Sequence, residues 1–538
     1  MKDYSFLLVG INAKYIHSNP AIRSLKAYAG KEYKDVVSIR EYTINNRREE
    51  ILSDIYKLRP DAIGFSVYIW NVNLVRELIC DLSKLLPTCQ IFLGGPEVSY
   101  DSEQYLKDYP NVAAIILGEG EITFRRILAA RTDSCYIGND LELIPGLLLR
   151  SGYTGPQEAV DMDHLPFLYQ SEGMSLLEDY ENRIIYYESS RGCPYNCSYC
   201  LSSIERGLHF RSLPLVLEEL DFFLKNNVKQ VKFIDRTFNI DSSRALEIWD
   251  FLQRNDNGVT NFHFEIAGDI LTAAEIEMLG KFRPGQVQLE IGVQTTNEKA
   301  MKAINRPCNI KHLSEVVELI RSKNNIHIHL DLIAGLPYED FESFKQSFND
   351  VFNMRPHQLQ LGFLKVLNGT PIKKQAGEFG ICYCNEPPYE VLYTDSISYD
   401  EILILKNVEA VTEIYYNSSQ FTQSLPYLLD FFDTPFDLFE ALGKYYEDNG
   451  LFVVTPARSK RYDILLDFSD SFTNCDKEHL RYLLTLDYYM REKPKAKPSF
   501  VINPPDKDLI CYDIRNPITG NYDILNQNDS DSIDSKGV

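Results

Sequence analysis

The chain has 538 residues, of which 44% are hydrophobic and 25% are charged, a globular composition that excludes wholesale disorder. There are 55 Lys and Arg against 77 Asp and Glu, giving a net charge of −22. Because binding to nucleic-acid phosphates needs a surplus of Lys and Arg, nucleic acid is not an expected partner. No apolar run approaches the roughly 20 residues that span a bilayer, and the start lacks a signal-peptide pattern. We therefore expect a cytoplasmic protein without membrane contact.

Residues 1–145 predict an α/β domain built on a parallel sheet. Short apolar runs alternate with segments of helical periodicity, which is typical of strands covered on both faces. The predicted strands are 4–10, 36–42, 62–69, 90–94 and 113–117. The loops after the first, fourth and fifth of these are polar or glycine-rich. They would lie at the carboxyl edge of the sheet, where such folds bind ligands.

Glycines and prolines in residues 146–180 indicate turns and a linker. A second series of strands and helices follows, over residues 181–368. The predicted strands are 184–189, 228–235, 261–267, 286–293, 326–334 and 358–366. Six such units predict a partial (β/α)6 barrel with its chemistry at the carboxyl ends of the strands.

Residues 369–525 predict a third, mostly helical domain, and residues 526–538 a polar tail. Cys382 and Cys384 in this region would share one face of a strand, and we expect them to be isolated reduced thiols. Polar residues also alternate within two predicted barrel strands: His263 with Glu265, and His329 with Asp331. Because an unpaired buried carboxylate is costly, we expect Glu265 and Asp331 to face the barrel lumen.

Cys193, Cys197 and Cys200 form a C-x3-C-x2-C triad on the loop after the first barrel strand. The 11 cysteines are odd in number and widely spread, which argues against a disulfide framework. Three thiolates can hold three irons of a [4Fe–4S] cluster and leave the fourth iron open. A structural zinc site needs a fourth ligand, and no partner pair of cysteines is present. We expect the cluster; structural thiols or an incomplete zinc site are the alternatives.

At this triad the sequence resembles the radical S-adenosylmethionine (SAM) superfamily, with Tyr199 at the aromatic position of the pattern C-x3-C-x-aromatic-C. The resemblance covers about residues 184–366. It implies that SAM chelates the open iron and is cleaved reductively to a 5′-deoxyadenosyl radical, which abstracts hydrogen. Matches to further family motifs imply a set of SAM-binding residues: Tyr199, Asp235, Glu265, Gly292, Gln294, Arg306 and Gly335. Strand-end packing or surface ion pairs are the alternative roles for each.

Residues 1–145 resemble the cobalamin-binding domain that precedes the barrel in a group of radical SAM proteins, which implies a flavodoxin-like sheet. The resemblance implies a set of cobalamin-binding residues: Asn12, His17, Ser66, Tyr68, Gly94, Gly95, Gly118 and Glu119. The Asp-x-His-x-x-Gly motif that supplies the lower cobalt ligand is absent. His17 is the histidine on the corresponding loop, and no carboxylate lies nearby in residues 12–20 to fix its tautomer. We therefore expect cobalamin without a protein imidazole beneath cobalt.

The whole arrangement resembles a bacterial family of B12-binding radical SAM proteins with an additional C-terminal domain. It implies methyl transfer to an unactivated carbon of a small-molecule or peptide substrate, with flavodoxin or ferredoxin as electron donor. A B12-dependent rearrangement or cyclisation without methylation is the alternative within this class. A metal-binding or sensory module with a structural Cys site is the alternative from another class. A tRNA methylthiotransferase is disfavoured by the charge of −22 and by the scattered Cys80, Cys89 and Cys135.

Overall fold

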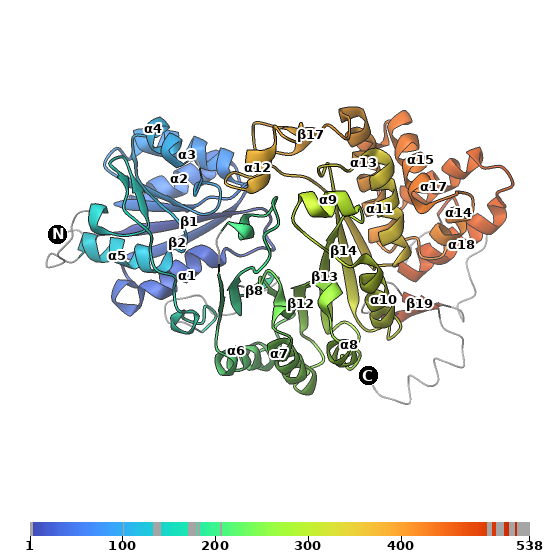
Figure 1. Ribbon diagram of the computed structural model, residues 1–538, viewed down its shortest axis with the longest axis horizontal. Coiled ribbons are helices and arrows are strands. Elements are labelled where there is room, and N and C mark those ends of the chain that lie inside the picture. Colours follow the sequence, from blue (N-terminus) through green and yellow to red (C-terminus); the bar gives the residue numbers. More distant parts are fainter. Residues whose placement is uncertain are drawn as a thin grey trace.

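The computed structural model describes residues 4–100, 102–132, 141–170, 180, 183–204, 207–491, 498–501, 510–515 and 522–524. Figure 1 shows an N-terminal α/β unit, an open barrel in the middle and a helical C-terminal part, side by side along the long axis. The predicted tail, 526–538, lies outside the described residues. Within the described ranges, no helix has both the length and the apolar character that a membrane span requires.

The first sheet has seven strands in the order β2-β1-β3-β4-β5-β6-β7. Its first five strands are parallel and confirm the five predicted ones within a few residues. They are β1 (Phe6–Asn12), β2 (Val37–Thr43), β3 (Ala62–Ser66), β4 (Gln90–Gly94) and β5 (Val112–Ile116). β1 and β3 are buried along their whole length, because helices cover both faces of the sheet.

Two further strands correct the expectation that residues 146–180 are only a linker. β6 (Leu147–Leu149) pairs antiparallel with β5, and β7 (Gly152–Tyr153) pairs antiparallel with β6. The three leucines of β6 are buried, so this segment completes the edge of the sheet. The surrounding glycines and prolines, from which we inferred a linker, form the turns around this hairpin.

Five helices cover the two faces of the first sheet. They are α1 (Pro20–Ala29), α2 (Arg48–Leu58), α3 (Val72–Leu85), α4 (Ser102–Asp108) and α5 (Glu121–Thr132). The apolar clusters put α2, α3 and α4 on one face of the sheet and α1 and α5 on the other. The Asn19 side chain caps α1 by accepting a hydrogen bond from the Ile22 amide at 3.2 Å, so the helix begins directly after the loop that follows β1.

The second large sheet is fully parallel, with six strands in the order β15-β14-β13-β12-β11-β8. Its strands are β8 (Ile185–Tyr187), β11 (Gln230–Phe233), β12 (Asn261–Ile266), β13 (Val287–Gln294), β14 (His327–Ala334) and β15 (Gln358–Phe363). Its helices are α6 (Leu213–Lys225), α7 (Ser242–Arg254), α8 (Ala273–Leu279), α9 (Glu298–Ala303), α10 (Ile310–Arg321) and α11 (Phe341–Asn353). The predicted six-unit partial barrel is confirmed. A small hairpin of β9 (Ser190–Gly192) and β10 (Leu208–Phe210) was not predicted.

The C-terminal part is mostly helical, as predicted, and shares one continuous apolar core with the barrel. Its helices are α13 (Tyr399–Thr412), α14 (Ser424–Leu429), α15 (Pro435–Asp448), α16 (Leu451–Val454), α17 (Lys460–Phe468) and α18 (Lys477–Arg491). A strand pair, β18 (Ile510–Arg515) and β19 (Tyr522–Ile524), lies near the chain end. Lys345 of α11 pairs with Asp437 of α15 at 2.5 Å, and the Phe436 amide donates to Asn349 of α11 at 2.9 Å.

A short connecting segment joins all three parts. It contains α12 (Pro371–Gln375), β16 (Cys382–Tyr383) and β17 (Val391–Tyr393), and Figure 1 shows it running across the gap between the first sheet and the barrel. The Ile372 amide donates to the Ser198 carbonyl at 2.9 Å. The Tyr389 hydroxyl donates to the buried Glu97 carboxylate after β4. The segment therefore contacts both the triad loop and the first sheet.

Candidate active site

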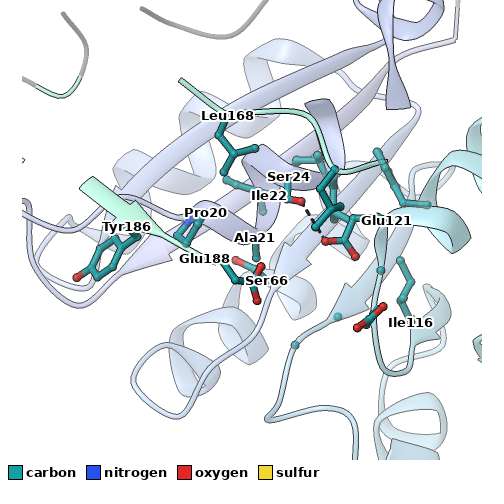
Figure 2. A pocket seen from close by; sticks show the side chains of 18 of the residues that line it. Pro20, Ala21, Ile22, Ser24, Ser66, Ile116, Glu121, Leu168, Tyr186 and Glu188 are labelled. Carbon is teal, nitrogen blue, oxygen red and sulfur yellow. Dashed lines mark hydrogen bonds between the residues drawn. The ribbon is translucent and has the colours of Figure 1, made fainter. Parts of the chain in front are cut away.

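A cavity of about 370 Å³ lies where the carboxyl edge of the first sheet faces the barrel. Figure 2 shows residues of both parts around it, with Pro20, Ser24 and Ser66 from the N-terminal unit and Tyr186 and Glu188 from the barrel. Its wall also includes Arg191, two residues before the first cysteine of the triad. The cavity therefore joins the two regions for which the sequence predicts cofactors.

Six of the eight residues proposed for cobalamin line this cavity. They are Ser66, Tyr68, Gly94, Gly95, Gly118 and Glu119. Deeper walls are apolar and come from the sheet and α5, including Phe6, Leu8, Phe92 and Phe124. A cavity with apolar depth and polar groups at its mouth is typical of cofactor sites, so the residues present fit part of a large organic cofactor that enters at this edge.

Two glycines shape the mouth of the cavity in different ways. Gly95 has φ +110°, and a Cβ there would lie 2.6 Å from the Val67 carbonyl oxygen. Gly118 has φ +74°, but a Cβ there would meet nothing within 4 Å. Gly95 is thus required by the backbone itself, whereas Gly118 adjoins open space that a ligand can enter.

Asn12 and His17 do not line the cavity. The Asn12 amide donates to Glu41 at 3.0 Å and to the His17 carbonyl at 3.1 Å. The His17 Nδ1 atom lies 2.5 Å from the Tyr186 hydroxyl of β8. Burial and the nearby charges of Lys14 and Lys232 lower the pKa of His17. These contacts give both residues a role in joining the loop after β1 to its surroundings.

The triad loop is fixed by backbone contacts from distant segments. The Ser198 amide donates to the Ile304 carbonyl at 2.8 Å, and the Asn305 side chain donates to the Asn196 carbonyl at 3.0 Å. Gly192 has φ +99°, and a Cβ there would lie 2.0 Å from the Gly207 carbonyl oxygen. Only glycine therefore allows the β9–β10 pairing that directs the chain into Cys193.

The three thiols of the triad act on one another. Burial raises the pKa of Cys197, and the neighbouring Cys200 and Cys193 thiols raise it further. Three such thiolates can each bind a different iron of a [4Fe–4S] cluster, whereas a structural zinc site needs four ligands.

Arg306 connects the triad loop to the end of β13. It donates to the Gly292 carbonyl at 2.8 Å and lies 3.8 Å from Cys197 Sγ. A Cβ on Gly292 would lie 2.2 Å from the Gln294 side chain, and Gln294 itself has φ +73° at a β-bulge. Burial raises the pKa of Cys197, and the Arg306 charge opposes that shift. Gly292, Gln294, Arg306 and Cys197 are thus one connected group, as required if SAM binds here.

Asp235 and Gly335 have structural contacts that the motif matches did not predict. The Asp235 carboxylate is 1% exposed and accepts hydrogen bonds from the Ser189 amide and from the Ser189 and Ser190 hydroxyls, at 2.6–2.8 Å. It therefore positions the strand that leads into the triad and is not directed at a ligand. A Cβ on Gly335 would lie 2.6 Å from Val391 of β17, so this glycine is required by packing against the connecting segment.

Arg191 is the residue near the triad that the sequence did not assign. Its guanidinium pairs with Glu188 at 2.8 Å, with Glu121 at 3.1 Å and with Glu119 at 3.4 Å. Glu119 also accepts a hydrogen bond from the Val160 amide at 2.6 Å. The arginine precedes Gly192 and Cys193 in sequence. Two of its partners, Glu119 and Glu121, come from the loop after β5 and the start of α5, a contact that only the three-dimensional arrangement reveals.

The barrel lumen holds a second group of charged side chains. Lys232 of β11 lies 3.0 Å from Glu290 of β13 and 3.7 Å from Glu265 of β12. His263 of β12 lies 2.9 Å from Glu290. These contacts join three adjacent strands across one face of the sheet, while the opposite face packs against helices.

Tyr199 contacts the apolar core next to the triad.

Comparison with known protein families agrees with this geometry. Residues 7–128 match the family model described as the B12 binding domain, and residues 187–351 match that of the Radical SAM superfamily. The chain joins a B12 binding domain to a radical SAM domain. Residues 377–524 match a family described as a protein of unknown function, DUF4080. The predicted resemblance and the cofactors of the two domain types, cobalamin and SAM with a [4Fe–4S] cluster, are thereby confirmed.

The chain spans roughly half of the length of the curated relatives it matches. The cobalamin-dependent radical SAM methyltransferase TokK of Streptomyces tokunonensis is 24% identical over 347 residues, covering 59% of this chain and 48% of TokK. The anaerobic magnesium-protoporphyrin IX monomethyl ester cyclase of Rubrivivax gelatinosus is 22% identical, covering 60% of each chain. The solved structure of the cobalamin-dependent SAM radical enzyme OxsB aligns with TM-score 0.60 at 14% identity, covering 90% of this chain and 84% of OxsB. This last likeness confirms the fold of the two domains.

Proposed function

We propose that the chain is a cobalamin-dependent radical SAM enzyme that transfers a methyl group to an unactivated carbon of its substrate. The observation that carries the proposal is the cavity whose wall combines Ser66 and Gly118 of the B12 binding domain with Arg191 of the triad loop. When bound, the cluster would supply the electron that cleaves SAM, and cobalamin would carry the methyl group. TokK, a methyltransferase by name, supports the proposal.

The chain's own residues have separate tasks in this scheme. Cys193, Cys197 and Cys200 would hold the cluster, and Gly292, Gln294 and Arg306 would bind SAM beside it. Ser66, Tyr68, Gly94, Gly118 and Glu119 would bind cobalamin. Asp235 and Arg191 are positioning residues that set the path of the triad loop. The electron would come from a small reductant protein such as flavodoxin or ferredoxin.

A methyl-labelling experiment tests the reaction type. An anaerobic extract of a strain that lacks the gene is incubated with the protein, a reductant and SAM carrying a deuterated methyl group, and is then analysed by mass spectrometry. We expect a labelled product with wild-type protein that is absent with Cys197→Ala and present with Cys382→Ala, the matched control outside the triad. A protein-dependent product without label would instead support a rearrangement or cyclisation, the reaction type of the Rubrivivax relative.

A further inference from the structure

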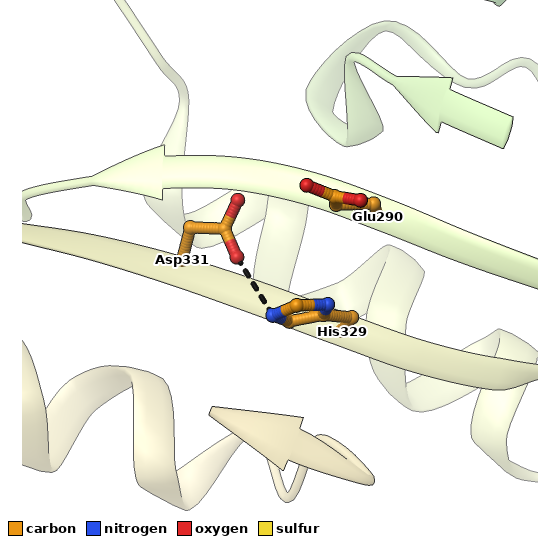
Figure 3. A group of neighbouring side chains, drawn as sticks. All are labelled: Glu290, His329 and Asp331. Carbon is orange, nitrogen blue, oxygen red and sulfur yellow. Dashed lines mark ion pairs between the residues drawn. The ribbon is translucent and has the colours of Figure 1, made fainter. Parts of the chain in front are cut away.

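Three side chains in the barrel lumen form a group separate from the triad and the cavity. Glu290 lies on β13, and His329 and Asp331 lie on the neighbouring β14, with one potential ligand atom of each within 4.8 Å of the others. Figure 3 shows the three side chains turned toward one another between the two strands. The parallel register pairs Glu290 with His329 and Gly292 with Asp331, so the strands hold these side chains in place.

The contact between His329 and Asp331 has the distance of a hydrogen bond without its geometry. His329 Nε2 lies 3.0 Å from Asp331 Oδ1, yet both atoms are buried and neither makes a hydrogen bond. The His329 side chain is only 8% exposed. A buried polar atom without a partner costs about 1–3 kcal/mol. Neighbouring ligand atoms held about 2.1 Å from an octahedral ion lie about 3.0 Å apart. His329 Nε2 and Asp331 Oδ1 have this separation.

The surroundings of Glu290 are those of a ligand held in place by neighbours. Its Oε2 atom accepts a hydrogen bond from Lys232 at 3.0 Å and lies 2.9 Å from His263 Nε2, a contact without hydrogen-bond geometry, which leaves Oε1 for another partner. Carboxylates that bind metals are commonly oriented by such outer contacts. Two further carboxylates, Glu265 and Asp331, lie in this part of the lumen against the cations of Lys232 and Arg236, so the acidic groups outnumber these cations.

We propose that Glu290, His329 and Asp331 bind a divalent transition-metal ion inside the barrel. Two carboxylates and one imidazole are ligands that suit Mn²⁺, Fe²⁺ or Zn²⁺. Three protein ligands leave coordination positions open to oxygen or nitrogen donors from the lumen, as in catalytic metal sites. None of the three residues belongs to the triad or to the residues proposed above to bind SAM or cobalamin, although Asp331 pairs in register with Gly292.

Mn²⁺ binding tests this site, since Mn²⁺ prefers oxygen and imidazole ligands over the thiolates of the triad. Full-length protein in metal-free buffer is titrated with Mn²⁺, and free Mn²⁺ is followed by electron paramagnetic resonance. We expect one bound ion per chain and affinity reduced at least about tenfold by Asp331→Asn and by His329→Gln. Glu265→Gln, which removes a lumen carboxylate that is not a ligand, is the matched control and should lose clearly less affinity than either ligand variant.

Two results would overturn the proposal. One is wild-type protein that binds no Mn²⁺. The other is equal affinity in Asp331→Asn and Glu265→Gln, which would assign any binding to the general charge of the lumen. A pulsed paramagnetic resonance measurement needs only the wild-type protein, so it does not depend on whether the variants fold. Bound Mn²⁺ should show coupling to the nitrogen of one imidazole. The absence of this coupling would also contradict the site. These experiments measure Mn²⁺ binding and not SAM cleavage, so a negative result would not contradict the proposed function.

Discussion

The contact between His17 and Tyr186, 2.5 Å between Nδ1 and the hydroxyl, bears on how cobalt is coordinated. A histidine that binds a metal normally has its other ring nitrogen held by a carboxylate or carbonyl group. Here Nδ1 meets a tyrosine of the barrel, and His17 lies outside the cavity wall. We predict that the Co(II) form of bound cobalamin shows no nitrogen splitting from His17 in paramagnetic resonance. Splitting that disappears in His17→Ala would make His17 the axial ligand.

The buried carboxyl group of Glu339 should give the free energy of unfolding an unusual pH dependence. This carboxyl is 1% exposed, accepts hydrogen bonds from Thr295 at 2.5 Å and Ser347 at 3.0 Å, and has its Oε2 atom buried without a hydrogen bond. Burial raises the pKa of Glu339 from 4.5 to about 7. Between these values the folded state binds more protons than the unfolded state, so the free energy of unfolding falls as pH rises, by about 3 kcal/mol.

Glu339→Gln tests this by removing the titrating group while keeping its shape. The free energy of unfolding in urea is measured for both proteins. The value for the variant should rise relative to that of the wild type as the pH increases from 5 to 8. Glu342→Gln, at an exposed carboxyl in the first turn of α11, which begins two residues after Glu339, should follow the wild type at both pH values. If the difference between Glu339→Gln and wild type does not change with pH, Glu339 titrates as an ordinary carboxyl and the burial argument fails.

At the scale of elements, α1 forms a wall of the cavity through Ala21 and leaves Ala27 outside it. Ala21→Trp should fill part of the space and weaken hydroxocobalamin binding at least about tenfold, because a packed site has little room for added volume. Ala27→Trp adds the same side chain to the same helix away from the cavity. The visible spectrum of the bound cofactor measures both. Equal affinities would place cobalamin elsewhere.

This pair of variants is a better probe than a substitution at Gly95. Gly95 is one of the residues predicted to bind cobalamin, so a large side chain there would also be expected to block the ligand. In the structure Gly95 has φ +110° and its missing Cβ faces the Val67 carbonyl, so any side chain there would strain the backbone first. Loss of binding would then not distinguish a blocked site from a distorted loop.

The sequence predicts strands where a local apolar pattern determines them, but it does not predict which side chains pair with one another. Apolar runs located β1 through β5 and the barrel strands, since such runs reflect burial on both faces. β6 was missed because three leucines between glycines and prolines look like a turn region. The pairing of Glu290 with Lys232 and His263 depends on the register of three strands. Asp235 matched a motif for SAM contact, yet its hydrogen bonds go to Ser189 and Ser190.

For the whole molecule, Arg191 links the triad loop to the B12 binding domain. Removing its guanidinium would leave Glu121, which is 5% exposed, without its cation. Arg191→Met should therefore lower the free energy of unfolding by about 2 kcal/mol, below the range for fully buried pairs, because the arginine is partly exposed. Arg125→Met removes an exposed pair with Glu32 inside the first domain and should cost less than about 1 kcal/mol.

Denaturant unfolding of both variants measures this link between domains, with hydrogen exchange of the loop after β5 as a local readout. Arg191→Met should speed exchange in that loop, and Arg125→Met should not. Equal stability and equal exchange in the two variants would mean that the domains are held together without Arg191. In that case the connecting segment, through Tyr389 and Glu97, would be the principal tie.

We propose that the Cys193, Cys197 and Cys200 loop supports reductive cleavage of SAM. Release of 5′-deoxyadenosine by anaerobically reconstituted protein supplied with SAM and dithionite tests this. We expect slow release without substrate, with about four irons per chain, and loss of both the iron and the release in Cys197→Ala. Release of only methylthioadenosine or adenosylhomocysteine under every condition, or a full cluster retained in Cys197→Ala, would contradict it.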